Sequence, residues 1–522
     1  MYRKTHKKDK NDKKDKKTIK VEKGITQHIK QNTKQHIKHH TTQQSTLHNY
    51  INTIRMARTK HTKNKSFKTS IHKQPTTNFK SKRTDNKLSH NYINTLIHLF
   101  YDNDIVSTRY LQNAHKKSNI FPPQTRIIVI GDIHGDFNAA IKCFVLAKCI
   151  EPIEPPINKT VENMDAFFNK LKWIGDDTYV VQLGDQIDRV RPQTWDKNDI
   201  TNDEAFEDEG STLEIFYLFF YLDILARESS GRVFSILGNH EIMNVAGDFR
   251  YVSQKEFKSF KTHLGNTYHR NSLFPYHSKT LKNNTHKINY YDDSFLESEF
   301  KKSGGTHANA KKVTNIKGFK ERLFAFAPTG LCSNMMALNN YTMLQIGNWL
   351  FCHGSPTINT LNTYTIELIN SVVSMYLLGI DSHKQVIEKH YDMITDSKNN
   401  SILWNRDFGD SSESGNFDDS SNKHSDKDST KDNTKLCKLL DKILISYNKN
   451  NNNTNNKNIA THIALGHTPQ FNDGVGMNSI CNNRVWRCDV GMSKAFGDNT
   501  NDEYRKPQVL EILNGNITNV LS

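Results

Sequence analysis

Residues Arg126–Asp136 read RIIVIGDIHGD, and this stretch decides the fold of the chain. The apolar, β-branched run Ile127–Ile130 ends at Gly131, which predicts a buried strand that leads into a tight turn. At the end of such a strand, Asp132 and His134 lie two residues apart, so a carboxylate and an imidazole can point to one place, as metal ligands must. The stretch therefore predicts one side of a metal site.

The same arrangement recurs along the chain, where predicted strands end at glycine or histidine junctions that carry potential ligands. Because these strands alternate with predicted helices, the pattern indicates an α/β fold. The strands are 178–183 before GDQIDR, 232–237 before GNHE, the hairpin of 342–346 and 349–352 before HG, 459–465 before GHT, 485–490, and 508–513, which closes the chain. The predicted helices are 92–101, 137–147, 211–228 and 436–446, with Asp136 as the N-cap of the second rather than a ligand.

Six residues at these strand ends have side chains that bind metals. Carboxylate, amide and imidazole ligands together suit Mn, Fe or Zn rather than Ca or a thiolate-bound metal. Six ligands exceed what one catalytic ion uses, so we predict two ions that share one carboxylate, with Asp185 as the bridging candidate. Two ions about 3.5–4 Å apart can hold a bridging hydroxide for in-line attack on a phosphate ester. The predicted ligands are Asp132, His134, Asp185, Asn239, His353 and His467.

Neighbouring residues can supply the other groups that phosphate ester hydrolysis requires. His240, directly after Asn239, can protonate the leaving oxygen, and Asp188 can orient its imidazole. Arg189, one residue beyond Asp188, is predicted to hold phosphate oxygens with its planar guanidinium. Arg406 is predicted as a second phosphate-binding arginine, and Asn239 is predicted to contact the phosphate as well as a metal.

Taken in order, GDIHGD, GDQIDR, GNHE, HG and GHT resemble the motifs of the phosphoprotein phosphatase branch of the calcineurin-like metallophosphoesterases. The run GNHEIMNVAGDFRYV (238–252), the LWNR around Arg406 and DVGMSKAFG (489–497) are similar to Shewanella-like phosphatases. The resemblance spans about residues 122–522 and implies two mixed β-sheets packed face to face between helices. It implies that the substrate is a phosphorylated protein or peptide.

The resemblance also implies roles for the same residues. His240 is the general acid with Asp188 as its partner, and Arg189 and Arg406 bind phosphate. One metal is held by Asp132, His134 and Asp185, and the other by Asp185, Asn239, His353 and His467.

Two departures from the family pattern concern the substrate. Gln186 stands where a small apolar residue or Tyr is usual, and Pro328-Thr329-Gly330 stands where Pro-Gly-Gly is commoner. The substrate is left open between phosphoserine or phosphothreonine and phosphotyrosine. Two alternatives are a dinucleoside polyphosphate or RNA-end hydrolase of the diadenosine tetraphosphatase-like type, and a catalytically silent phosphate-binding scaffold.

Residues 1–90 differ from the rest of the chain in charge. They carry 25 Lys and Arg against 5 Asp and Glu, whereas residues 91–522 carry 46 against 50. Their polar composition predicts a disordered basic arm, which could bind a nucleic acid or an anionic surface, although a solvated tail is the simpler interpretation. A helical lead-in at 91–120 and a catalytic domain at 121–522 are predicted to follow, with low-complexity insertions at about 408–435 and 448–457.

The seven cysteines form no CxxC pair and are odd in number, which predicts reduced thiols rather than a zinc ribbon or a disulfide framework. The N-terminus lacks the apolar core of a signal peptide, and the longest apolar run, 213–226, contains Glu214 and Asp223. We therefore expect a cytoplasmic protein, with nuclear import an option through Lys80–Arg83, that is neither secreted nor inserted in a membrane.

Overall fold

The computed structural model describes residues 91–101, 106, 118–191, 205–270, 316–380, 384–397, 401–409, 429–451 and 459–522. These residues all belong to one compact unit, which comprises Asn91–Ser107 and Lys116–Ser522. The predicted basic arm, residues 1–90, lies outside the described residues, as do 410–428 and 452–458 of the predicted insertions. The arm therefore stays a prediction.

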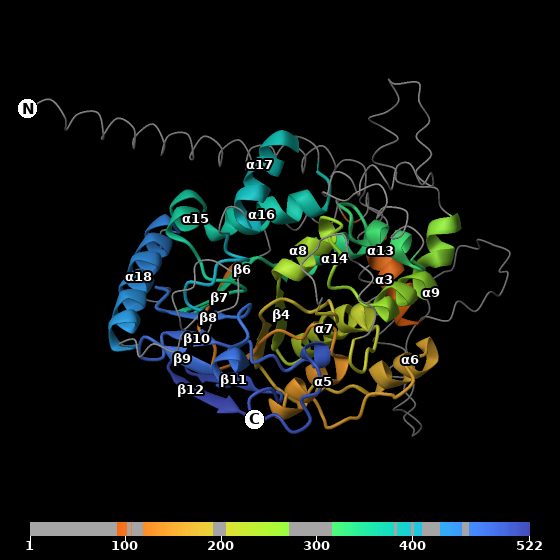
Figure 1. Cartoon of the computed structure of the whole chain (residues 1–522), viewed down its shortest axis with the longest axis horizontal. Helices are drawn as coiled ribbons and strands as arrows, with labels where there is room; N and C mark the ends of the chain where they lie inside the picture. The colour runs from red at the N-terminus through yellow and green to blue at the C-terminus, as the bar shows by residue number, and fades with distance from the viewer. Residues whose placement is uncertain are drawn as a thin grey trace, which may run out of the picture. The chain divides into compact units, whose positions relative to one another are not determined.

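Two six-stranded sheets of mixed direction form the centre of the fold (Figure 1). In order across the first sheet, the strands are β12 (Ile517–Leu521), β11 (Val509–Leu513), β2 (Arg126–Ile130), β3 (Tyr179–Gln182), β4 (Arg232–Ile236) and β5 (Asn340–Tyr341). Across the second, they are β1 (Ile120–Phe121), β6 (Met343–Ile346), β7 (Trp349–Cys352), β8 (His462–Leu465), β10 (Val485–Arg487) and β9 (Asn478–Ile480).

Parallel pairing in each sheet brings the motif-bearing strand ends together. β2, β3 and β4 are parallel neighbours in the first sheet, and β7, β8 and β10 are parallel neighbours in the second. Because the carboxyl ends of parallel strands meet at one edge of a sheet, the residues that follow these strands collect there.

Helices flank the two sheets, as the family resemblance implies. Helix α7 packs against β4 and α16 against β6, and Figure 1 shows α15–α18 on one side of the sheets and α5–α7 on the other. None of the described helices is long and apolar enough to cross a bilayer. The helices beside the first sheet and its loops are α3 (Tyr92–Phe100), α5 (Phe137–Leu146), α6 (Val161–Lys170), α7 (Thr212–Arg227), α8 (Asn239–Val245), α9 (Gln254–Arg270) and α13 (Phe319–Phe326). The others are α14 (Leu331–Asn339), α15 (Ile358–Thr363), α16 (Ile366–Leu377), α17 (Lys384–Thr395), α18 (Ser429–Asn450) and the 3₁₀ turns η4 (Gln470–Asp473) and η5 (Lys494–Phe496).

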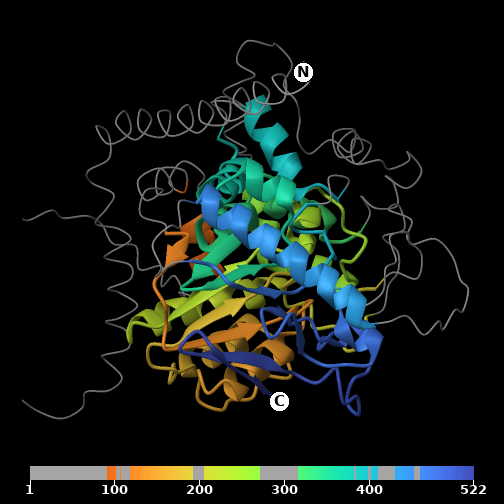
Figure 2. The same ribbon diagram turned by 90° about the vertical axis from the view of Figure 1, so that its left-hand side faces the viewer.

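The predicted strands and helices are present, but the C-terminal part differs in two respects. The helix predicted at 436–446 is only the centre of α18, so residues 429–435 and 448–450 are helical rather than part of low-complexity loops. The chain does not close on β11, because β12 follows it and pairs with it at the edge of the first sheet. Helix α18 buries Leu440, Leu444 and Tyr447 at helical spacing, and it crosses the face of the molecule that Figure 2 shows.

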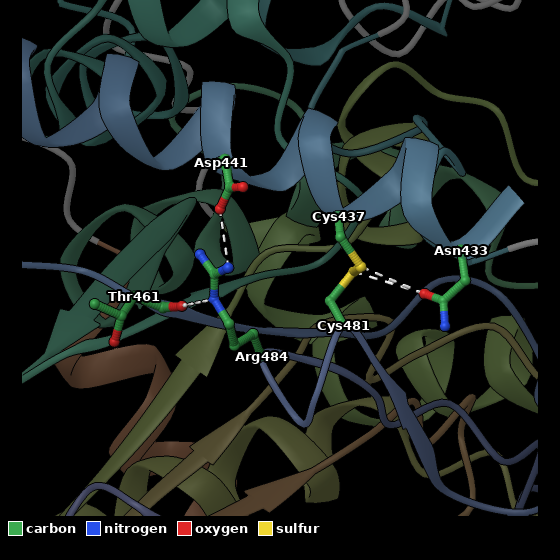
Figure 3. The surroundings of a disulfide bond; sticks show 6 residues. All are labelled: Asn433, Cys437, Asp441, Thr461, Cys481 and Arg484. Atoms are coloured by element: carbon green, nitrogen blue, oxygen red, sulfur yellow. Dashed lines mark hydrogen bonds and ion pairs between the residues drawn. A yellow bond between two sulfur atoms is a disulfide. The ribbon is translucent and has the colours of Figure 1, made fainter. Parts of the chain in front are cut away.

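A disulfide joins Cys437 of α18 to Cys481, which follows β9 (Figure 3). The prediction of reduced thiols is therefore wrong for this pair, while the other five cysteines are free and buried. Beside the disulfide, Arg484 Nη1 pairs with Asp441 Oδ1 at 2.9 Å (Figure 3). The disulfide and the ion pair both tie α18 to the turn that leads into β10.

Reduction of the Cys437–Cys481 bond is expected to destabilise the folded chain. The two residues are 44 positions apart, and a cross-link that closes a loop of this length typically adds about 2–4 kcal/mol by restricting the unfolded chain. Urea unfolding with and without dithiothreitol measures this loss. The Cys437→Ser, Cys481→Ser double variant is the control, because its stability should not respond to the reductant. Equal stability of the wild-type protein in both conditions would contradict the expectation.

Candidate metal centre

The loop after β3 carries the residues around which the site is built. Asp185 and Asp188 have φ angles of 51° and 75°, a left-handed conformation that non-glycine residues adopt at a cost. The buried carboxylate of Glu241, from the GNHE motif, accepts hydrogen bonds from the backbone N–H groups of Asp185 and Gln186, each at 2.9 Å. It also accepts one from Gly238 at 2.7 Å. Glu241 thus fixes the first half of this loop to α8.

A second buried glutamate fixes the other half of the loop. Glu256 of α9 accepts hydrogen bonds from the backbone N–H groups of Asp188 at 3.2 Å and Arg189 at 3.1 Å. It also accepts one from Thr212 Oγ1 at 2.9 Å, at the start of α7. Backbone N–H groups satisfy both carboxylates, as buried acidic groups require.

Asp185 lies at the centre of the potential ligands. Its Oδ2 is 3.3 Å from His353 Nε2 and 3.8 Å from Nε2 of both His134 and His240. There are two groups of residues in which the potential ligand atoms all lie within 4.8 Å of one another, as binding of a metal ion requires, and all these residues are buried. The groups are His134, Asp185 and His240, and Asp185, His353 and His467. Asp185 belongs to both, as a carboxylate shared by two ions would.

Backbone carbonyls orient three of the histidines. A carbonyl only accepts, so the ring nitrogen that faces it carries the proton and the other keeps its lone pair for a metal. The pairs are His134 Nδ1 with Ile187 O at 3.3 Å, His353 Nδ1 with Leu183 O at 2.9 Å, and His467 Nε2 with Trp404 O at 3.1 Å. The His353 bond also joins the two sheets, because Leu183 follows β3 and His353 follows β7.

The electrostatics around these histidines follow from burial and from Asp185. Burial lowers the pKa of His134 and of His467, which favours the neutral form that binds metals. Burial acts in the same direction on His353, but the charge and hydrogen bond of Asp185, together with the Leu183 carbonyl and the charge of Glu241, outweigh it and raise the pKa of that group. A cation between the imidazole and the carboxylate would take the place of this proton.

Asp132, Asn239 and Asp489 complete the buried donor set. Asp132 accepts the backbone N–H of His467 at 3.1 Å, and burial together with the charge of Asp489 raises its pKa. Asn239 Oδ1 lies 2.8 Å from His353 Nε2. Within the described residues, Asp489 Oδ2 is buried without a hydrogen-bond partner, and burial raises the pKa of this carboxyl to about 6. Buried carboxylates with no lysine or arginine partner among the described residues, beside oriented imidazoles, fit divalent metal ions.

The predicted acid pair is formed, and two residues that the sequence analysis missed support it. His240 Nδ1 lies 2.8 Å from Asp188 Oδ2. Asp188 also accepts hydrogen bonds from Asn244 Nδ2 at 2.9 Å and from Arg322 Nη2 at 3.1 Å, and all four side chains are buried. Asn244 lies in the 238–252 run and could have been noticed there. Arg322 comes from α13, where no motif marks it.

The two predicted phosphate-binding arginines lie in different surroundings. The guanidinium of Arg189 is fully buried, with Nη1 at 3.0 Å from Asp136 Oδ2. Arg406 is half-buried, and its charge adds to burial in lowering the pKa of His467, so it lies near that histidine. Asp136 also caps α5 through Ala139 N, which confirms the predicted N-cap.

The two departures from the family pattern differ in how well the local structure accommodates them. Gln186 is buried and its Nε2 donates to Ser235 Oγ at 3.0 Å, so its amide is held by β4. Thr329 has a φ of 76°, where glycine is the easier residue, and its N–H donates to Leu377 O at 2.8 Å.

Comparison with known proteins agrees with this geometry. Residues 125–371 match the family model described as calcineurin-like phosphoesterase. The chain contains a calcineurin-like phosphoesterase domain. It is 24% identical to Shewanella-like protein phosphatase 2 of Arabidopsis thaliana over 429 residues. This alignment covers 80% of this chain and 84% of that protein. The chain is also 24% identical over 371 residues to Shewanella-like protein phosphatase 1 of Plasmodium berghei, with 70% and 67% covered.

Among solved structures, the cold-active protein-tyrosine phosphatase of a psychrophilic Shewanella species has a TM-score of 0.41 at 16% identity, over 78% of this chain and 82% of that one. The family resemblance drawn from the motifs is confirmed by the family model and the phosphatase relatives, and the chain is a hydrolase of the metallophosphoesterase type. Arg406, His467 and Asp489 lie beyond the matched stretch, and the fold brings them to the same site.

Replacing Glu241 with glutamine should destabilise the β3 loop. The amide keeps the shape of the carboxylate, but its NH₂ would face a backbone N–H, which leaves a buried donor unsatisfied at a cost of about 1–3 kcal/mol. Urea unfolding of the metal-free protein measures the loss. Glu154→Gln, at an exposed position, is the matched control for removal of one negative charge. Equal stability of the two variants would show that Glu241 does not hold the loop.

Proposed function

We propose that this chain is a protein phosphatase that hydrolyses the phosphomonoesters phosphoserine, phosphothreonine or phosphotyrosine in a protein or peptide. The observation that carries the proposal is the His240–Asp188 pair, at 2.8 Å, beside the Asp185-centred ligand groups. A proton donor next to a site for two cations suits the cleavage of a phosphate ester. The relatives named protein phosphatases support the same substrate class.

The protein groups divide the work among metal binding, proton donation and positioning. Asp132, His134 and Asp185 are proposed to hold one ion, and Asp185, Asn239, His353 and His467 the other. When bound, the two ions supply Lewis acidity toward the phosphoryl oxygens and activation of water.

His240 is proposed to donate the proton to the leaving oxygen. Its Nδ1 is held by Asp188, so Nε2 is the nitrogen that faces the site, 3.8 Å from Asp185 Oδ2. Arg322 and Asn244 hold Asp188 in place, because both donate to its carboxylate. The imidazole therefore cannot turn without breaking its bond to an anchored carboxylate.

Removal of the proposed acid should abolish most turnover. The full-length chain loaded with Mn²⁺ is assayed for phosphate release from phosphothreonine peptide, phosphotyrosine peptide and diadenosine tetraphosphate. His240→Ala should lower kcat on the preferred peptide by about 10²–10⁴-fold, the usual contribution of a positioned acid. Chelation with EDTA should remove activity from the wild-type protein, and Mn²⁺ should restore it.

The controls separate the remaining alternatives. His98→Ala, at an exposed position of α3, should leave kcat unchanged. Turnover of the dinucleotide alone would replace the protein phosphatase proposal with a nucleotide or RNA-end hydrolase, and a nucleic acid partner for residues 1–90 would then merit a test. Silence of the metal-loaded protein on all three substrates would favour the phosphate-binding scaffold.

A further inference from the structure

Two arginines follow Asp188, and their guanidinium groups have different surroundings. Arg189 pairs with Asp136 at 3.0 Å, lies 3.4 Å from Ser493 Oγ, and donates through Nη2 to the carbonyls of Phe206 and Glu207 at 3.3 and 3.2 Å. Its Nε has no partner among the described residues, but it is enclosed with the rest of the side chain. Arg189 thus joins three loops and presents no accessible donor to a substrate.

Arg191 is half-buried and keeps most of its donors free. Only Nη1 has partners in the part of the chain that the structure describes, the carbonyls of Val190 at 3.0 Å and Asp188 at 3.4 Å. No carboxylate of the described residues forms an ion pair with it. The unpartnered nitrogens, Nε and Nη2, form the side-on edge of the guanidinium, which is the edge that binds two oxygens of a phosphate at once.

Aromatic rings hold this guanidinium beside the proposed acid and one of the proposed ligands. Its centre lies 4.3 Å from the ring of Phe496 and 5.7 Å from that of Tyr251. The Tyr251 ring is 4.6 Å from His240, and the Phe496 ring is 5.6 Å from His134.

The charge of Arg191 also acts on the site. Burial lowers the pKa of His134, and Arg191 is the next cause of that lowering. Burial raises the pKa of Asp489, and Arg191 is among the groups that oppose the increase. Its unpaired positive charge is therefore close to the ligands, on the side of His134 and His240.

We propose that Arg191, rather than Arg189, binds the phosphoryl oxygens of the substrate, and that Arg189 is a positioning residue that holds the loops around the site. The inference rests on the proposed function, because it concerns the phosphate group of that substrate. Arg406, near His467, would provide the second cation beside the other ligand group. The Val190-Arg191 pair that follows the GDQIDR motif thus changes which arginine meets the substrate.

Phosphate binding tests this assignment independently of turnover. Inorganic phosphate is titrated calorimetrically into the Mn²⁺-loaded full-length chain and into its Arg191→Met variant. Loss of a charge-assisted, two-point contact should weaken binding by about 10- to 100-fold. The melting temperature should stay close to that of the wild-type protein, because the hydrogen bonds lost among the described residues are only those from Nη1 to the adjacent carbonyls of Val190 and Asp188. With a phosphopeptide, kcat/KM should fall by a similar factor, and Arg191→Lys should restore only part of it.

Arg250→Met is the matched control. Its guanidinium also lies 5.7 Å from the Tyr251 ring, but Asp248 pairs with it at 2.6 Å, so phosphate affinity should change less than twofold. Arg189→Lys should instead lower the melting temperature by a few degrees, because it breaks the contacts that join the three loops.

Three results would overturn the assignment. These are phosphate affinity within twofold of wild type in Arg191→Met, a loss of affinity in Arg189→Lys without a change in melting temperature, or no phosphate binding by the metal-loaded wild-type protein. The first result with normal peptide turnover would reject the inference and keep the proposed function. If phosphate binding depends on Arg191 but the protein cleaves no phosphopeptide, the assignment of Arg191 as a phosphate-binding residue is kept and the proposed function is rejected.

Discussion

The site depends on two buried glutamates that hold one loop. Glu241 and Glu256 reach the segment from Asp185 to Arg189 from different helices, and each accepts at least two of its backbone N–H groups. Because Asp185 and Asp188 have positive φ angles, the loop is strained, and strain of this kind persists only where the surrounding structure enforces it. The enforced conformation turns Asp185 toward the histidines and Asp188 toward His240. The same short segment thereby positions the residues proposed for metal binding and for proton donation.

Two motifs require glycine because a carboxylate packs closely against the backbone at that position. A Cβ at Gly238 would lie 2.1 Å from Asp185 Oδ1, and one at Gly466 would lie 2.3 Å from Asp132 Oδ1, so neither position accepts a side chain. The glycines of GNHE and GHT therefore allow a carboxylate to approach the backbone, in addition to the potential ligands that the two motifs carry. The GHT backbone also donates to Asp132, through His467 N at 3.1 Å, which ties the end of β8 to the end of β2. The two sheets meet at the site through these contacts.

The sequence predicts those parts of the site that local pattern determines. A ligand after each strand, a cap at Asp136 and a hairpin before His353 are all encoded within a few residues, and the structure has the strands, the cap and the hairpin in place. Arg322, Glu256 and the Cys437–Cys481 bond depend on chain segments far apart in sequence that the fold brings together, and no local spacing reveals them. The length of α18 was missed for a different reason, because its first turns are too polar to suggest a helix that packs.

The distribution of charge partners separates positioning carboxylates from those available to metals. Asp136 pairs with Arg189 and Asp188 pairs with Arg322, each at about 3 Å, so an arginine neutralises each of these two. Asp132, Asp185 and Asp489 are equally buried, yet within the described residues no lysine or arginine forms an ion pair with any of them. Buried negative charge without a counter-ion is costly, and several such groups close together cost more. Divalent cations held by Asp132 and Asp185 would offset that cost, whereas Asp136 and Asp188 already have fixed arginine partners.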